Sequence, residues 1–394
     1  MSKALILDAA RTPRARVRRG GGTLADIPPA ELLAVVLREL STRGLKDERV
    51  EDLIVGVSTT VGEQGGNVGR VAAMLAGWSD TVPAGVTSRL CCSGLDAISS
   101  GAAQIVSGGA DLIVAAGVES MSRVPMLADK PAFATDPSVG EATGFVSIGV
   151  SADATAIRAG ISRAELDAYG VRSQHRASNA PAWESIVPVT TPSGAVLSHD
   201  EGARADTTLA SISELAPLFA EDPLWERVQR WLDVSAGEDR GRHTVATAPQ
   251  FADAAAAIVL SSEAWANEHE QKPRGQILGW AQAAVRSPGL EATIPASLKA
   301  LARAGLQASD VSIAEVNESF AVTPLLLARE LGLPEHIVNP NGGAIAVGHP
   351  LGASGGILIA NALDQLRRRG GGYGLVTIPA ALGLATAVVI EAFA

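Results

Sequence analysis

Residues 341–356 read NGGAIAVGHPLGASGG, and this run is the most informative stretch of the chain. It places one histidine, His349, among glycines and other small residues, directly before Pro350. Glycine permits tight turns and lets the backbone approach a ligand closely. An imidazole on such a turn can take a proton from a reactive group and later donate it. The run therefore favours a catalytic histidine over a histidine that is merely satisfied inside a core.

A second run, residues 89–95 (RLCCSGL), places Cys91 just before a helical pattern. At a helix start, free backbone N–H groups and the helix dipole stabilise a thiolate. A cysteine combined with a distant histidine is the raw material of a nucleophilic acyl-transfer site. The alternative, a buried structural cysteine, stays open on this motif alone. We interpret the neighbouring Cys92 as a space-filling residue.

A third candidate is Asn317, within residues 315–320 (EVNESF). An asparagine at the end of a predicted strand can hold a water or a substrate carbonyl by hydrogen bonding. A turn-forming asparagine is the default interpretation of this segment. The catalytic interpretation gains weight only because His349 and Cys91 accompany it.

Composition limits the function classes. The 394 residues are 47% apolar and 19% charged, which predicts a folded protein with room for two domains. The net charge of −10 argues against nucleic acid as the main partner. An anionic substrate would then need a local basic patch. The one dense basic run, Arg14, Arg16, Arg18 and Arg19, is expected to be a solvated loop.

The two cysteines of the chain are adjacent, so no disulfide framework is expected, and a reducing compartment fits. The apolar stretch at the N-terminus is too short for a signal peptide. No apolar run approaches the roughly 20 residues of a spanning helix. We expect a cytoplasmic protein that contacts no membrane and holds no metal.

The chain repeats itself with a fixed spacing. Gly305, Gly355 and Gly370 each lie 261 positions after an earlier glycine. Each half alternates strands and helices, which predicts a layered α/β architecture. The predicted strands are residues 4–7, 53–57, 112–116 and 388–391, and the predicted helices are residues 30–40, 95–105, 297–304 and 355–366.

Residues 119–250 interrupt this repeat. Ser162 and Glu165 form a capping-box pattern that predicts a helix through Arg176. Residues 223–232 predict an amphipathic helix that carries Trp225 and Trp231. We interpret these two tryptophans as packing residues; an apolar wall over an acyl or pantetheine channel is the alternative.

The three runs, in this order and spacing, closely resemble the thiolase family of condensing enzymes. The resemblance extends to residues 8–13 (DAARTP), 118–122 (VESMS) and 294–301 (IPASLKAL), and so covers almost the whole chain. It implies a duplicated α/β fold in five layers, α/β/α/β/α, with an inserted loop domain. The implied domains are residues 1–274, with the loop domain at about 119–250, and residues 275–394.

The resemblance also implies an acyltransferase with assigned site residues. Cys91 would accept the acyl group, His349 would activate it, and Asn317 would hold a water in an oxyanion hole. Pro249, Ser319 and Thr377 become candidates for substrate binding. The substrate would be a CoA thioester, with an acyl carrier protein thioester as the alternative, and no separate cofactor. A homodimer or homotetramer is expected.

The sequence departs from the family pattern in three places. Family members carry a second catalytic cysteine in a Cys-x-Gly motif near the C-terminus, but residues 376–383 here read VTIPAALG. In our alignment Thr377 replaces the cysteine and Pro379 the glycine, so a thiolate base and an N–H donor are lost. Pro249 stands where the family has a serine that contacts CoA, and residues 223–242 form an insertion.

These departures leave several hypotheses open. The preferred one is a thiolase-like acyltransferase that forms an acyl-Cys91 intermediate but is not an ordinary acetoacetyl-CoA thiolase. Decarboxylative condensation of the ketosynthase kind is one alternative, because loss of CO₂ generates the carbanion without a cysteine base. A silent homologue that serves as a binding subunit is another. A nicotinamide enzyme lacks support, since no G-x-G-x-x-G follows the first strand.

Overall fold

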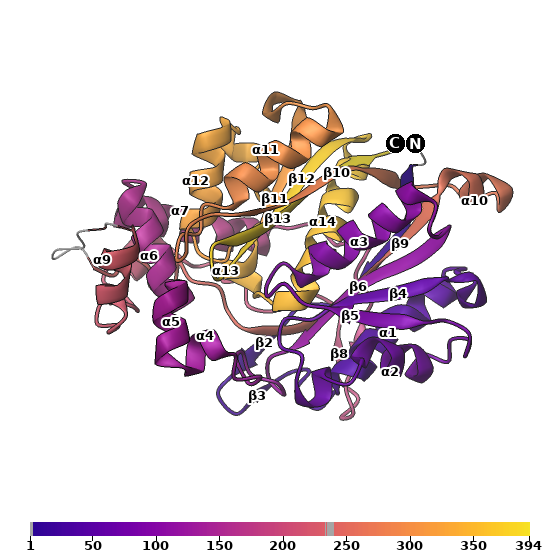
Figure 1. Ribbon diagram of the computed structural model, residues 1–394, viewed down its shortest axis with the longest axis horizontal. Helices are drawn as coiled ribbons and strands as arrows, with labels where there is room; N and C mark the ends of the chain where they lie inside the picture. Colours follow the sequence, from indigo (N-terminus) through magenta and orange to yellow (C-terminus); the bar gives the residue numbers. More distant parts are fainter. Residues whose placement is uncertain (1–2, 233, 235–239) are drawn as a thin grey trace.

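The computed structural model describes residues 3–232, 234 and 240–394. Figure 1 shows its helices and strands, with the two termini side by side. The strands are β1 (Ala4–Arg11), β2 (Ala15–Arg18), β3 (Gly21–Gly22), β4 (Asp52–Gly56), β5 (Ala84–Thr87), β6 (Leu112–Ser120), β7 (Val189–Thr190), β8 (Val196–Leu197), β9 (Ala252–Ser262), β10 (Gly275–Ala284), β11 (Val311–Val316), β12 (Gly372–Ala380) and β13 (Leu384–Ala392). The α-helices are α1 (Pro29–Thr42), α2 (Val68–Leu75), α3 (Ser93–Ser107), α4 (Ala132–Thr135), α5 (Pro137–Thr143), α6 (Ile148–Arg158), α7 (Arg163–Ser178), α8 (Leu209–Ile212), α9 (Trp225–Leu232), α10 (Glu263–Glu268), α11 (Thr293–Ala304), α12 (Val322–Leu331), α13 (Ala344–Val347) and α14 (Ser354–Arg368), and the short 3-10 helices are η1 (Asp47–Arg49), η2 (Gly62–Gln64), η3 (Ala308–Asp310), η4 (Glu335–Ile337) and η5 (Leu351–Ala353).

The main sheet runs in the order β11-β12-β13-β10-β1-β9-β6-β4-β5. The pairs β4–β5, β4–β6 and β11–β12 are parallel, and the remaining neighbours in this order are antiparallel. The N-terminal and C-terminal halves join through a short β1–β10 pairing, from Ala4 opposite Ile277 to Ile6 opposite Gly275. Parallel strands require helical crossovers, so both faces of each half must be covered.

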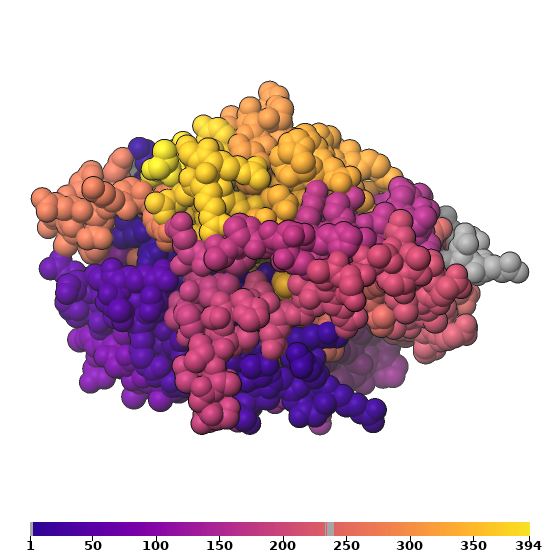
Figure 2. Space-filling model, turned by 180° about the vertical axis from the view of Figure 1, so that it is seen from behind, coloured from indigo at the N-terminus to yellow at the C-terminus, as the bar shows by residue number. Residues whose placement is uncertain are grey.

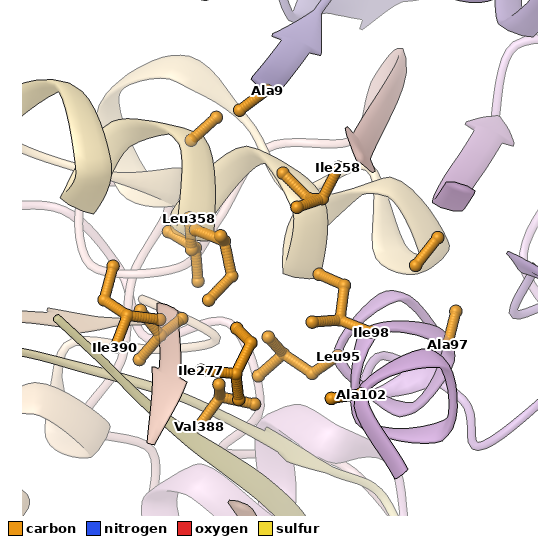
Figure 3. Packing of buried hydrophobic residues seen from close by; sticks show 14 of the residues in the cluster. Ala9, Leu95, Ala97, Ile98, Ala102, Ile258, Ile277, Leu358, Val388 and Ile390 are labelled. Carbon is orange, nitrogen blue, oxygen red and sulfur yellow. The ribbon is translucent and has the colours of Figure 1, made fainter. Parts of the chain in front are cut away.

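Helices α3 and α14 form a middle layer between the two halves of the sheet. In Figure 3, Leu95 of α3 and Leu358 of α14 lie among Ile258 of β9 and Val388 and Ile390 of β13, and all five belong to one buried cluster. Helix α1 packs on the outer face of the N-terminal half and α11 on the outer face of the C-terminal half. The result is five layers, α/β/α/β/α, and this confirms the predicted fold class.

The internal repeat is visible in the structure. Helix α14 begins and ends 261 positions after α3, and η3 begins 261 positions after η1. The starts of the two central helices touch without side chains between them. A Cβ on Gly94 would lie 2.5 Å from the carbonyl oxygen of Gly352 and 3.2 Å from the nitrogen of Gly355. Glycine at position 94 therefore allows the turns that carry Cys91 and His349 to meet.

The predicted helices and strands are found, with boundaries that differ by a few residues. The predicted strand 4–7 continues to Arg11 because the chain stays paired with β9 through that residue. The capping box of Ser162 and Glu165 is present at the start of α7. Trp225 is fully buried and donates to the carbonyl of Phe219 at 2.7 Å, which supports the packing interpretation for this residue.

The inserted region covers one side of the molecule. Figure 2 shows its magenta and red segments lying across the seam between the indigo N-terminal part and the yellow C-terminal part. In the part of the chain that the structure describes, no helix is both long and apolar enough to cross a bilayer.

The basic run near the N-terminus is only partly solvated. Arg18 and Arg19 are exposed as expected, but Arg14 is 5% exposed. The solvated-loop prediction is wrong for Arg14 because Asp200 meets it from the inserted region, at 2.7 Å, together with Arg11 at 2.8 Å. Burial acts to raise the pKa of Asp200, but the two guanidinium groups hold that pKa below its usual value.

Candidate active site

The segment before α3 is a tight turn that ends at Cys91 and Cys92. Leu90 has a φ of 51°, a left-handed conformation that costs a residue with a Cβ roughly 1–2 kcal/mol. Ser93 stabilises this turn, because its hydroxyl accepts from the N–H of Arg89 at 2.9 Å and donates to the carbonyl of Leu90 at 2.6 Å. Cys92 is the N-cap residue, so Cys91 lies one position outside the helix.

Burial raises the pKa of both thiols. Burial raises the pKa of Cys91 well above its usual value, and Cys92 and Glu119 raise it further by charge. Burial raises the pKa of Cys92 to about 12, and its Sγ donates to the carbonyl of Ile378 at 3.2 Å. Burial of the Cys91 thiol therefore opposes the stabilisation of a thiolate that the helix start provides.

His349 is held by three hydrogen bonds. Its backbone N–H donates to the carbonyl of Gln250 at 2.7 Å. In the ring, Nδ1 lies 2.7 Å from the hydroxyl of Ser354, and Nε2 lies 3.3 Å from Nδ2 of Asn317. Burial, helped by the charge of Arg14, lowers the pKa of His349 to about 3. The ring is neutral. With the Asn317 amide in this orientation, Nδ1 carries the hydrogen and Nε2 presents a lone pair.

Asn317 stands where strand β11 separates from β12. Its N–H donates to the carbonyl of Thr377 at 2.9 Å, and its Nδ2 donates to the hydroxyl of Ser319 at 2.8 Å. In a parallel ladder the next bond would come from the N–H of residue 379 to the carbonyl of Asn317. Pro379 has no N–H, so the ladder stops and the chain is free to turn away.

The end of strand β12 links the motifs. The carbonyl of Ile378 accepts from Cys92, and the carbonyl of Thr377 accepts from Asn317. The Thr377 hydroxyl itself donates to the carbonyl of Thr386 at 3.0 Å and is fully buried. Cys91 and His349 come from runs almost 260 positions apart in the sequence. Their turns thus lie at the end of β12, on the two sides of the contact between Gly94 and Gly352.

The other predicted site residues take different places. Ser319 supports the Asn317 amide, and Pro249 directly precedes Gln250, whose carbonyl holds the backbone of His349. Within the described residues, no hydrogen bond joins Sγ of Cys91 to the His349 ring. Packing of the two helix starts brings the Cys91 and His349 turns together.

Two carboxylates that sequence analysis did not single out lie beside the site. Glu119 falls in the quoted run VESMS and Glu318 in EVNESF, and both are fully buried. A charged residue within or just after a buried strand was the available signal, since buried carboxylates need partners. Ser354, which supports the ring of His349, also went unassigned. Among the described residues, no three His, Cys, Asp or Glu side chains gather in a way that could hold a metal ion.

The arrangement supports proton transfer between two uncharged side chains, the Cys91 thiol and the His349 imidazole. A neutral imidazole that reaches a buried thiol can take the thiol proton as the sulfur attacks a carbonyl, so no resting ion pair is needed. The Asn317 amide adds a donor that can serve an oxyanion or a water.

Two family descriptions match this chain. One described as "Thiolase, N-terminal domain" covers residues 4–223, and one described as "Thiolase, C-terminal domain" covers residues 271–392. Together the two matched ranges include Cys91, Asn317 and His349.

Curated relatives align over nearly their whole lengths. The chain is 37% identical to the 3-oxoadipyl-CoA/3-oxo-5,6-dehydrosuberyl-CoA thiolase of Escherichia coli (strain K12), over 99% of this chain and 100% of the relative. It is 36% identical to a beta-ketoadipyl-CoA thiolase of Pseudomonas knackmussii, over 98% of each chain. It is 35% identical to the 3-ketoacyl-CoA thiolase of Bacillus subtilis (strain 168), over 99% of this chain and 100% of the relative.

Proposed function

The chain belongs to the thiolase family, and from that premise we propose that it transfers acyl groups through a covalent intermediate on Cys91 and is poor at ordinary acetoacetyl-CoA thiolysis. Membership makes the chain an acyltransferase that uses CoA thioesters. The proposal concerns the identity of the nucleophile and the fate of the acyl group. The observation that carries it is the combination of an intact Cys91, His349 and Asn317 with a chain that has only two cysteines.

The first half-reaction follows from the site. Sγ of Cys91 attacks the thioester carbonyl while Nε2 of His349 takes its proton, and the Asn317 amide is placed to donate to an oxyanion. The carbon–sulfur bond to CoA then breaks, and the departing thiolate receives the proton from His349. The acyl group remains on Cys91 as a thioester.

The second half-reaction lacks the usual base. Condensation of acetyl-CoA requires removal of a weakly acidic α-proton, and the neighbouring Cys92 is buried, bonded to Ile378 and has a pKa of about 12. A threonine or proline at the end of β12 offers no thiolate. Losing one oxyanion donor alone costs roughly 3 kcal/mol of barrier. Two acceptor classes avoid the problem: a malonyl-type thioester that loses CO₂, and a heteroatom nucleophile.

The test is intact-protein mass spectrometry after exposure to acetyl-, succinyl- and malonyl-CoA. Succinyl-CoA belongs in the panel because the relatives are named for 3-oxoadipyl-CoA, whose thiolysis gives succinyl-CoA and acetyl-CoA. We expect a mass gain that Cys92→Ala keeps and Cys91→Ala loses. A protein that takes no acyl group from any donor would instead be the silent homologue.

A gain-of-function experiment tests the missing base directly. Thr377→Cys and Pro379→Cys each return a thiol to the end of β12, at the two positions where this chain departs from the Cys-x-Gly motif. We expect one of them to raise the rate of thiolysis of acetoacetyl-CoA or 3-oxoadipyl-CoA above that of the unmodified protein. Efficient thiolysis by the unmodified protein, unchanged in Thr377→Ala, would contradict the claim that this motif limits the reaction.

We also propose that the chain forms a homodimer through strand β5. This strand ends the sheet order and is paired on one side by β4. Helix α2 next to it exposes Val71, Met74 and Leu75. An open strand edge beside apolar side chains favours pairing with a second copy. Light scattering of the purified protein and of Met74→Glu tests the idea, since the charge is expected to weaken the dimer.

A further inference from the structure

Glu119 accepts four hydrogen bonds and offers none. Its Oε2 accepts from the N–H of Ser58 at 2.9 Å and of Gly352 at 2.8 Å, and its Oε1 accepts from the N–H of Thr59 at 3.2 Å and from Nε2 of Gln64 at 2.7 Å. Burial raises the pKa of Glu119, against the effect of these donors. Since both oxygens are filled by N–H groups, a proton would break a bond, and we assign the ionised form.

Glu318 has the same pattern on the other side. Its Oε1 accepts from the hydroxyl of Tyr169 at 2.8 Å and from Nδ2 of Asn339 at 3.4 Å. Its Oε2 accepts from the hydroxyl of Ser173 at 2.7 Å and from the N–H of Ile345 at 2.9 Å. Both carboxylates are fully buried, and each therefore depends on its four donors for charge stabilisation.

The two carboxylates hold opposite ends of one segment. Ile345 lies four residues before His349 and Gly352 three residues after it. Gly348, directly before His349, has a φ of 97°, a conformation that favours glycine and lets the backbone turn there. We infer that Glu119 and Glu318 are positioning residues that fix the turn at both ends and so place the His349 ring for the acylation of Cys91.

The arrangement explains why the anchors come from opposite sides. Glu119 belongs to β6, and the N-terminal half that contains β6 also presents Cys91. Glu318 belongs to the segment after β11 that presents Asn317. Each anchor thus ties His349 to one of its two partners. A charged hydrogen bond is short and directional, so loss of one anchor shifts the ring. Misplacement of a catalytic group by about 1 Å lowers a rate by roughly a hundredfold.

The inference rests on the proposed role of His349, and the experiment separates the two. The rate of Cys91 acylation is measured by mass spectrometry in Glu119→Gln and Glu318→Gln, each with and without His349→Ala. The glutamine NH₂ group cannot accept from the donors that one carboxylate oxygen held, which are two N–H groups at either oxygen of Glu119 and one hydroxyl and one N–H group at either oxygen of Glu318. We expect each single variant to slow acylation by roughly ten- to a hundredfold, and the same change in the His349→Ala background to have less than about a twofold effect.

A matched control is Glu315→Gln. Glu315 is a buried carboxyl on β11 whose Oε1 accepts from Gln365, and among the described residues it makes no hydrogen bond to the turn that carries His349. Acylation in this variant should stay within about twofold of the unmodified protein. If the glutamine variants do not fold, two milder variants replace them. Gln64→Met removes one donor from Glu119, Tyr169→Phe removes one donor from Glu318, and both keep the carboxylate charge. We expect these variants to slow acylation less, with the same dependence on His349.

Other outcomes overturn the inference. Equal fold losses with and without His349 would mean that the carboxylates act elsewhere. Faster iodoacetamide labelling of Cys91 in Glu119→Gln, in both backgrounds, would mean that Glu119 acts on the thiol by charge alone. Acylation could also stay unchanged in both glutamine variants while His349→Ala still slows it in the otherwise unmodified protein. That result would refute the positioning role and leave the proposed function intact. Absence of acylation in the unmodified protein would instead refute the proposed function.

Discussion

The side-chain amide nitrogen of Asn317 lies 3.3 Å from Nε2 of His349, the one ring atom with a free lone pair. The contact is longer than a strong hydrogen bond, so the lone pair is only loosely held. It can turn to the thiol of Cys91 when substrate arrives, while the amide turns to an oxyanion or a water. In the proposed mechanism, His349 would transfer the proton and Asn317 would stabilise the charge.

Removal of the imidazole should separate its chemical role from a structural one. In His349→Ala we expect acylation of Cys91 to slow by roughly a hundredfold or more, as for other general bases. The reason is that the buried thiol has a raised pKa and needs an acceptor for its proton. Time-resolved mass spectrometry with acetyl-CoA measures the rate. Unchanged acylation would mean that His349 only supports the turn.

The two adjacent cysteines should differ in reactivity. Cys91 is 9% exposed, whereas Cys92 is fully buried and bonded to the carbonyl of Ile378. Iodoacetamide should therefore label Cys91 faster than Cys92 at neutral pH, with Cys91→Ala and Cys92→Ala as paired controls. Peptide mapping identifies the labelled residue, and preferential labelling of Cys92 would refute the nucleophile assignment.

The depressed pKa of His349 makes stability depend on acid. The folded protein holds this ring neutral to a pKa of about 3, whereas the unfolded chain takes a proton near 6.5. The unfolded state then binds more protons between these values, so stability is full above pH 6.5 and falls as the pH drops toward 3. The total is about 5 kcal/mol. Urea unfolding from pH 7 to 4 should lose less free energy in His349→Gln, and parallel curves for the two proteins would contradict the linkage.

Glu315 predicts the opposite trend. Burial raises its pKa to about 7, so the folded protein keeps a proton that the unfolded chain releases near 4.5. Stability from this group is present below pH 4.5 and is lost as the pH rises toward 7. Glu315→Gln cannot ionise and should be more stable than the unmodified protein at pH 8, by up to about 3 kcal/mol, with no gain at pH 4. Thermal unfolding at the two pH values measures the difference.

The repeat and the glycine-rich runs predicted most of the architecture. Strand and helix periodicity located β4, β6, α1, α3 and α14, because a buried layered sheet demands long apolar segments at these places. The sequence could not predict that Arg14 would be buried, because its partner Asp200 is almost 190 positions away. Nor could it predict the depth at which Cys91 is buried, which raises the pKa of the thiol against the effect of the helix start.

The roles of Glu119 and Glu318 were hidden for a related reason. Each needs four donors from distant segments, and a single chain read from end to end does not show which donors converge. We interpreted Pro379 only as the loss of an N–H donor from the motif, but a missing N–H also ends a ladder, and the pairing with β11 does stop beside it.

The glycine contact between the starts of α3 and α14 has a consequence for dissection of the molecule. The proposed nucleophile, Cys91, comes from one half and its proposed base, His349, from the other, and the turns that carry them approach each other where Gly94 rests on Gly352. Two fragments divided in the inserted region, each inert by itself, should regain acylation only on reassociation. Because the termini lie side by side (Figure 1), a short linker could also close the chain into a circle and let new ends be opened elsewhere. Recovery of acyl transfer would thus show directly that the two halves of the chain have joined.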